Sequence, residues 1–270
     1  MIVDAHVHLL PDRLAAAIRR FFDDRMTPGL VSHGFVYPHR HAAARAALAA
    51  AGIDRCWSLP YAHKPGMASA LNRWMAETYA DDAMVVPGAT VHPADDVEAL
   101  VREALGQRGV RVMKLHCSVG GFAADDERLA PLWRYVSESG HPVVVHVGHA
   151  ENGTTAAEEI PALGRVARRW PEARIVVAHC GAPAVEATLA LLRETRSVHA
   201  DLAPIGRTLP PITREAVAGL EQRLLYGSDA PNTGLSVEDG VAHVRGLGLE
   251  REDEAAVLGG NAERLLARVR

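Results

Sequence analysis

The chain has 270 residues, of which 48% are hydrophobic and 23% charged, and its formal net charge is −4. High apolar content with a small net charge excludes a disordered chain, and the mild acidity argues against a nucleic-acid partner, which needs clustered Lys and Arg. No apolar run reaches the roughly 18 residues of a membrane span.

Short β-branched runs alternate with longer stretches rich in Ala, Leu, Arg and Glu along the whole chain. In chain order we predict strands at residues 2–8, 53–59, 84–91, 110–116, 142–147, 174–179, 197–202 and 223–228. Amphipathic patterns predict helices between them at 39–51, 68–80, 95–107, 126–139, 158–170, 183–194 and 211–221. Three further helical patterns follow the last strand, at 237–246, 251–258 and 261–269.

This alternation predicts an α/β protein built as a parallel (β/α)8 TIM barrel, a single domain over residues 1–270. Several predicted strands, such as residues 143–145, are apolar without alternation, which is typical of strands covered on both faces. An open doubly wound sheet is the alternative, but its G-x-G-x-x-G fingerprint after a strand is missing. The longest insertion, residues 9–40, holds several Pro and Gly and is expected to form a loop over the barrel mouth, as a lid on the active site.

The start of the chain and its cysteines favour a cytoplasmic protein. The first residues carry no basic stretch followed by an apolar leader, so we expect no signal peptide. The three cysteines are widely spaced and odd in number, which is typical of reduced thiols.

Polar side chains fall at the carboxyl ends of the predicted strands. His6 and His8 lie two apart at the end of the first strand and therefore share a face. His146 ends the fifth strand, His179 ends the sixth, and Asp229 follows the eighth. Because barrel active sites are built at these ends, we expect the five side chains to converge. Burying them without partners would cost a few kcal/mol each, about 2 or more, and a divalent cation would remove that cost.

Seven short segments carry a family resemblance. In chain order they are Asp-Ala-His-Val-His at 4–8, Ala-Thr-Val-His-Pro at 89–93, Val-Met-Lys-Leu-His at 112–116, Pro-Val-Val-Val-His-Val-Gly at 142–148, Val-Ala-His-Cys-Gly at 177–181, Tyr-Gly-Ser-Asp-Ala-Pro at 226–231 and Gly-Gly-Asn-Ala at 259–262. In this order they resemble the amidohydrolase superfamily, and within it the amidohydrolase-related group that includes aminocarboxymuconate-semialdehyde decarboxylase-like enzymes. The resemblance covers nearly the whole chain.

The resemblance implies a metal centre. His6, His8 and His146 would bind one divalent ion, usually zinc, and Asp229 would lie beside it as a weak ligand and proton acceptor for the metal-bound water. His179 would polarise the substrate or steady the water. The chemistry agrees, because three neutral imidazoles leave the ion's charge largely uncompensated and bring the pKa of bound water toward ~7. Asp229 can then act as general base and afterwards as general acid.

Lys114 raises a second interpretation of the centre. Some superfamily members carry a carbamylated lysine at this strand that bridges two metal ions, and Lys114, His146 and His179 would then hold a second ion. In the related single-metal group the lysine is unmodified, and here it would orient an anionic substrate or pair with a core carboxylate. His116, one pleat above Lys114, and His149, in the loop after the fifth strand, are further candidates to line the pocket.

These patterns predict a metal-dependent hydrolase that uses a metal-activated water on a small organic amide, ester or lactone. A non-oxidative decarboxylase on the same scaffold stays open because it shares the ligand set, as does a lactonase that works without metal. A barrel that binds metal only for stability is the non-enzymatic alternative. The expected partner is a small-molecule substrate, with neither nucleic acid nor membrane, and the frequency of symmetric dimers favours a homodimer.

Overall fold

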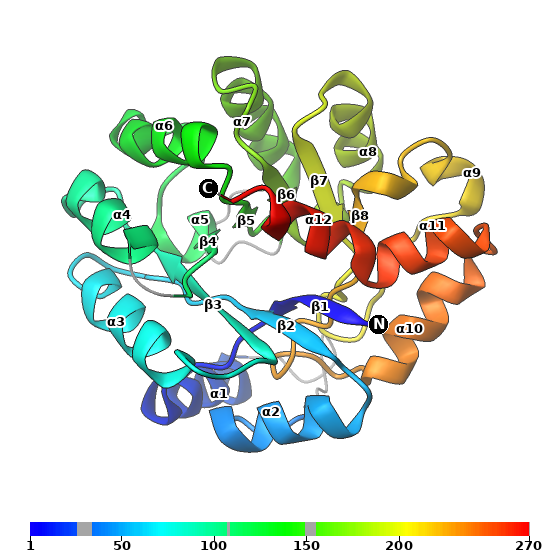
Figure 1. Cartoon of the computed structure of the whole chain (residues 1–270), viewed down its shortest axis with the longest axis horizontal. Helices are drawn as coiled ribbons and strands as arrows, with labels where there is room; N and C mark the ends of the chain where they lie inside the picture. The colour runs from blue at the N-terminus through cyan, green and yellow to red at the C-terminus, as the bar shows by residue number, and fades with distance from the viewer. Residues whose placement is uncertain (26–33, 107–108, 149–154, 270) are drawn as a thin grey trace.

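The computed structural model describes residues 1–25, 34–106, 109–148 and 155–269, which form a (β/α)8 barrel (Figure 1). Its eight parallel strands follow chain order in one sheet: β1 Val3–Val7, β2 Arg55–Ser58, β3 Val85–Thr90, β4 Val112–Leu115, β5 Val143–Val145, β6 Ile175–Val177, β7 Val198–Asp201 and β8 Leu224–Leu225. The barrel closes between its first and last strands, where the Ala5 amide donates to the Tyr226 carbonyl and the Asp229 amide to the His6 carbonyl. The predicted fold class is confirmed.

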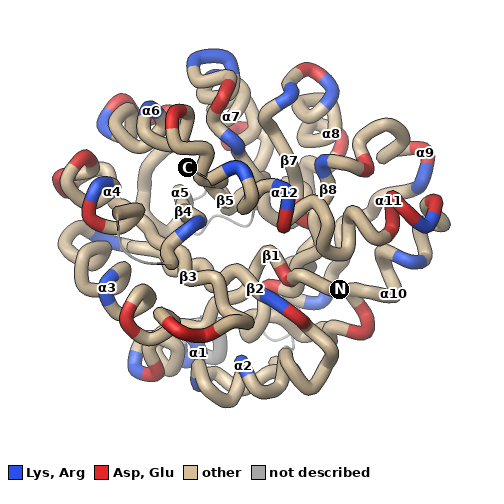
Figure 2. The backbone as a smooth tube through the Cα atoms, in the orientation of Figure 1, with Lys and Arg blue, Asp and Glu red and all other residues tan. Residues whose placement is uncertain are grey.

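A ring of helices surrounds the strands in Figure 1. The longer ones are α1 Asp12–Arg25, α2 His41–Ala50, α3 Ala68–Thr78, α4 Val97–Gly106, α6 Ala130–Ser139, α7 Ala156–Arg169, α8 Val185–Glu194 and α10 Val237–Gly246. Shorter helices are α5 Cys117–Gly120, α9 Arg214–Val217, α11 Arg251–Ala255 and α12 Asn261–Ala267. Charges of both signs are interspersed over these helices (Figure 2). None of the described helices is long and apolar enough to span a membrane.

The core has two parts, one between the strands and the outer helices and one inside the barrel. In the inner part, Trp57 and Val144 pack with Leu265 of α12, the helix that crosses the barrel end facing the viewer in Figure 1. Strand β1 contributes to both parts, because Ala5 belongs to the inner cluster and Val7 to the outer one. The pairing register of β1 against β2 shifts over this stretch, as in a β-bulge, and the shift changes which alternating side chains face the barrel axis.

The insertion over residues 9–40 departs from the expected loop. Its first half is α1, because the stretch from Asp12 to Arg25 is rich in Ala and Arg, which favour helix, and contains no Pro. The Asp12 carboxylate accepts a hydrogen bond from the His41 amide and joins the start of α1 to the start of α2. Residues 26–33 lie outside the described residues, so the lid over the active site stays a prediction.

Most predicted elements are shorter by a few residues in the structure, and the helix at 211–221 and the eighth strand lose the largest share. The helix expected at 211–221 is reduced to α9, since Pro210 and Pro211 precede it and Gly219, with a positive φ of 76°, follows it. The eighth strand keeps only Leu224 and Leu225 of residues 223–228. The residues after it still bond to β1, since the Ala5 amide donates to the Tyr226 carbonyl and the His8 amide to the Ala230 carbonyl, but they form no regular strand.

Buried His141, just before β5, generates a prediction about acid stability. Burial, with the Arg111 charge nearby, lowers its pKa from 6.5 to about 4. Between these values the unfolded chain binds a proton that the folded chain does not, so stability falls as the pH drops from 6.5 to 4, by up to about 1.4 kcal/mol per pH unit. His141→Gln should flatten this slope in urea unfolding curves measured from pH 8 to 4. An unchanged slope would show that His141 does not contribute.

Candidate metal centre

Three side chains from the first and last strands meet at the carboxyl end of the barrel. The Nε2 atom of His8 lies 3.0 Å from Oδ1 of Asp229, and Nε2 of His6 lies 3.7 Å from the same oxygen. His6 is fully buried, His8 nearly so, and Asp229 keeps 14% of its side chain exposed. One ligand atom from each of the three lies within 4.8 Å of the others, a spacing that one ion can bridge.

The hydrogen bonds behind the two rings leave their front nitrogens ready for a cation. Nδ1 of His8 lies 2.6 Å from the Leu59 carbonyl, and Nδ1 of His6 lies 2.9 Å from Oδ2 of Asp201. Both partners accept, so Nδ1 carries the proton in each ring and a neutral ring has its lone pair on Nε2. In the neutral tautomers two nitrogen lone pairs then face one carboxylate oxygen, an arrangement that a cation between them would stabilise. This donor set fits a divalent ion such as zinc.

Lys114 lies beside this group. It is fully buried, and its Nζ is 3.1 Å from Nε2 of His6. Burial lowers the pKa of Lys114 to about 8. Burial and the Lys114 charge together hold the pKa of His6 well below its usual range, so the His6 ring is neutral, as a metal ligand must be.

The second metal position, at Lys114, His146 and His179, stays a prediction. His6, His179 and Asp201 form a further group with ligand-like spacing, and His146 belongs to neither group among the described residues. His146 instead brings its Nε2 to 2.6 Å from the Gly148 carbonyl. Because a carbonyl only accepts, Nε2 holds the proton and the Nδ1 lone pair is the one available to a ligand. Its role as a third ligand stays a prediction.

The other predicted residues line the mouth as stacked and tilted rings. His116 stacks on His146 with ring centroids 3.8 Å apart, and His146 lies edge-on to His179 at 5.1 Å. Tyr61, which the sequence did not single out, contacts His8 and His116. Burial lowers the pKa of His116 and His179 well below their usual range and that of His146 to about 3, so this wall is uncharged at neutral pH.

Strained backbone places two of the predicted residues. The residues other than glycine with positive φ in the described chain are His179 (56°), Cys180 (50°) and Asp229 (56°). They lie in the turns that follow β6 and β8. Such conformations cost about 1–3 kcal/mol and persist where the surroundings enforce them, which is common at functional sites. The Nδ1 atom of His179 is also buried without a hydrogen-bond partner in the described part of the chain.

His149 lies outside the described residues, so its expected place at the pocket is left as predicted. Sequence reasoning also missed Asp201, a fully buried carboxylate that ends β7. The sequence did contain a signal for Asp201. It is a charged residue near the end of the predicted strand at 197–202, and the other candidates also lie at strand ends.

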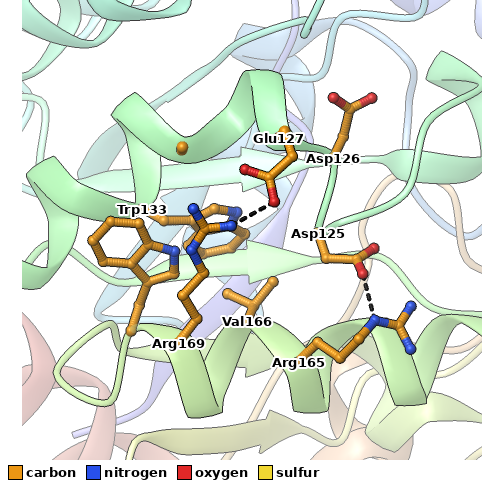
Figure 3. Close-up of a pocket in the computed structure, with 9 residues that line it drawn as sticks. Asp125, Asp126, Glu127, Trp133, Arg165, Val166 and Arg169 are labelled. Carbon is orange, nitrogen blue, oxygen red and sulfur yellow. Dashed lines mark hydrogen bonds and ion pairs between the residues drawn. The ribbon is translucent and has the colours of Figure 1, made fainter.

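Two hollows lie near or outside the mouth. A cavity of about 280 Å³ opens beside His146 and is lined by Cys117, Phe122 and Glu159, among others. A second hollow lies outside the barrel, where α7 faces the segment that leads into α6 (Figure 3). There Arg165 pairs with Asp125 and Arg169 pairs with Glu127, each at 2.5 Å. The outer hollow contains none of the predicted site residues, so the candidate site is the barrel mouth.

The chain was compared with known proteins. A family model described as Amidohydrolase matches residues 3–268, which confirms the resemblance. An uncharacterized TIM-barrel protein from Bordetella bronchiseptica is similar in structure, with a TM-score of 0.76, 21% identity and coverage of 99% of this chain and 98% of that one. For 5-carboxyvanillate decarboxylase from Sphingomonas paucimobilis the values are 0.69, 15%, 99% and 99%, and for dihydroorotase from Campylobacter jejuni 0.61, 16%, 98% and 82%. At these identities the likeness shows the fold alone, and no curated protein matches the sequence.

The turn that carries His146 depends on Glu159. Its Oε2 accepts a hydrogen bond from the Gly148 amide at 2.8 Å, and the carbonyl of the same glycine holds the His146 ring. Glu159→Ala should therefore lower the free energy of unfolding by about 1–3 kcal/mol, since it leaves a buried amide unpaired. Glu158→Ala is the matched control, because Glu158 is an exposed capping residue worth about 1 kcal/mol or less. Equal losses in urea unfolding would contradict a special role for Glu159.

Proposed function

The chain belongs to the amidohydrolase family, and from this premise we propose that it is a metal-dependent hydrolase of a small organic amide, ester or lactone. The observation that carries the proposal is the approach of two Nε2 lone pairs, of His6 and His8, to one oxygen of Asp229. We propose zinc as the ion, because imidazole and carboxylate donors suit it. When bound, such an ion lowers the pKa of a water molecule and polarises a substrate carbonyl.

Asp229 is the group we assign to proton transfer. It is the solvent-accessible member of the three, since 14% of its side chain is exposed while the two imidazoles are enclosed. The positive φ of Asp229 and the hydrogen bond from its backbone amide to the His6 carbonyl hold the carboxylate at the mouth. There it can take the proton of the attacking water and return it to the leaving group, as a general base and then a general acid.

His179 is the group we assign to the substrate. Its ring lies 4.9 Å from His6 and 5.1 Å from His146, centroid to centroid, and its Nδ1 has no partner in the described part of the chain. Because its pKa is lowered by burial, the ring is neutral and can donate a hydrogen bond from one nitrogen. A donor at this place would stabilise negative charge that develops on the substrate oxygen.

Decarboxylation is the second candidate function. The buried Lys114 amine at the centre favours a substrate that bears a carboxylate, and 5-carboxyvanillate decarboxylase shares this fold. In that reaction His179 would handle the proton at carbon. A lactonase that uses the same side chains without a metal is the third outcome to test, and it differs from both because its activity would survive chelation.

The metal content of the purified protein is the first prediction that follows from the proposed function. Purified protein should contain about one zinc-like ion per chain by elemental analysis, because the three donors match one tetrahedral site with an open position. His8→Ala should lose the ion. Chelator-treated wild-type protein should regain the ion when zinc is added back. It should then hydrolyse a member of a panel of amides, esters, lactones and aromatic carboxylates. Carbon dioxide as the product would favour the decarboxylase, and full activity in the chelated protein the metal-free lactonase.

Asp229→Asn is the second prediction. The amide oxygen still reaches the ion, so most of the metal should stay bound, but kcat should fall by at least about 100-fold because the proton acceptor is gone. Asp253→Asn on α11 is the matched control and should retain full activity, since this carboxylate bonds only a surface Gln222 among the described contacts. An Asp229→Asn enzyme with wild-type kcat would eliminate the assigned proton transfer.

A further inference from the structure

The side chain of Asp201, at the end of β7, forms hydrogen bonds to several groups of the candidate centre. Its carboxylate is fully buried. Oδ2 lies 2.9 Å from Nδ1 of His6, and Oδ1 accepts hydrogen bonds from the amides of His179 at 2.9 Å and Ala203 at 3.1 Å. One side chain thus contacts the histidine of β1 through its ring and the histidine after β6 through its backbone.

Both ends of the His6 ring define the same tautomer. At the back, a carboxylate oxygen that accepts requires a proton on Nδ1. At the front, the Lys114 ammonium offers only donors, so Nε2, 3.1 Å away, must be the acceptor. The lone pair of His6 is therefore on the nitrogen that faces Asp229 and Lys114, where a cation would bind.

The backbone contact fixes the second histidine. His179 has φ 56° and ψ 23°, a left-handed conformation that a residue with a Cβ adopts only where its surroundings enforce it. The hydrogen bond from its amide to Oδ1 of Asp201 is one such constraint, and it lies on the side of the carboxylate that His6 leaves unused. Loss of the carboxylate would therefore disturb the placement of both rings.

We propose that Asp201 is the positioning residue of the centre: it holds His6 in the tautomer that presents Nε2 to a cation, and it anchors the turn that presents His179. The part that concerns the cation rests on the proposed function, because it takes His6, His8 and Asp229 as the binding group. The part that concerns the tautomer does not, because it is a property of the metal-free protein.

Asp201→Asn tests the proposal with little change of shape. The amides of His179 and Ala203 both point at Oδ1, so the amide oxygen of the new side chain stays on that side and its NH2 group faces His6. An NH2 group donates, so it favours the His6 tautomer that has its lone pair on Nδ1 and its proton on Nε2, with the Lys114 ammonium turned away from Nε2. The ring stays in place, but its Nε2 then carries a proton and has no lone pair for the ion.

Asp4 provides the matched control. Like Asp201 it is a fully buried aspartate, and it lies in β1 two residues before His6. It bonds the Ser228 Oγ at 2.5 Å and the Ser228 amide at 3.0 Å, and it reaches His6 only through the backbone amide. Asp4→Asn therefore replaces a buried carboxyl group near the centre without touching an imidazole nitrogen. Any effect common to both variants reports general destabilisation.

Two measurements decide the proposal. Long-range proton–nitrogen correlation NMR of the chelator-treated protein should show His6 protonated on Nδ1 in the wild type and in Asp4→Asn, but on Nε2 in Asp201→Asn. Competition of each protein with a chromogenic chelator for zinc should show a loss of affinity of about 10- to 100-fold in Asp201→Asn and wild-type affinity in Asp4→Asn.

The outcomes separate the two proposals. Wild-type His6 protonated on Nε2 would overturn the proposal even if the Asp201→Asn variant did not fold, and so would an Asp201→Asn protein with the wild-type tautomer and affinity. A wild-type protein that binds no zinc but shows the tautomer switch would overturn the proposed metal-dependent function and leave the positioning role of Asp201 standing. Equally tight zinc binding by the wild type and by Asp201→Asn would overturn the positioning role of Asp201 and leave the proposed metal-dependent function standing.

Discussion

Strand β1 shifts its pairing register against β2 between Asp4 and Val7, and through this shift both histidines of the strand reach the barrel axis. Ala5 packs in the interior cluster, so regular alternation would turn Val7 inward next and His6 outward. One extra residue in the strand reverses that order. The bonds that close the barrel keep the shift in place, since the His6 carbonyl accepts the Asp229 amide and so brings the carboxylate to the imidazoles.

A barrel mouth that buries so many polar groups is stable only where each group has a partner or is uncharged. Burial lowers the pKa of His6 and His179, which keeps these two rings neutral and avoids the large desolvation cost of a buried cation. The hydrogen bonds of Asp201 and of the Leu59 carbonyl then decide which nitrogen of His6 and of His8 carries the proton. The same burial that stabilises the fold thus prepares neutral imidazole ligands.

The residues divide the work of the proposed enzyme by their exposure. In the proposed mechanism the enclosed imidazoles of His6 and His8 would hold the ion, while Asp229, at the solvent side, would move protons. Neutral rings and the Lys114 amine line the approach, so the site accepts a neutral or anionic substrate more readily than a cationic one. This arrangement is compatible with hydrolysis, in which water attacks the substrate, and with decarboxylation, in which carbon is protonated. The groups that contact the bound substrate decide between the two reactions.

The sequence by itself determined the fold class, the strand order and the five residues at the strand ends, because β-branched runs, helical periodicity and barrel geometry are local or repetitive signals. It could not determine that β1 carries a bulge, that residues 12–25 form a helix inside the insertion, or that Asp201 supports His6 from a strand 195 residues away. These features depend on register, packing and the meeting of distant segments. Hydrogen bonds such as those of Asp201 exist only after the barrel has closed, so tertiary structure alone decided which nitrogen of each imidazole faces the centre.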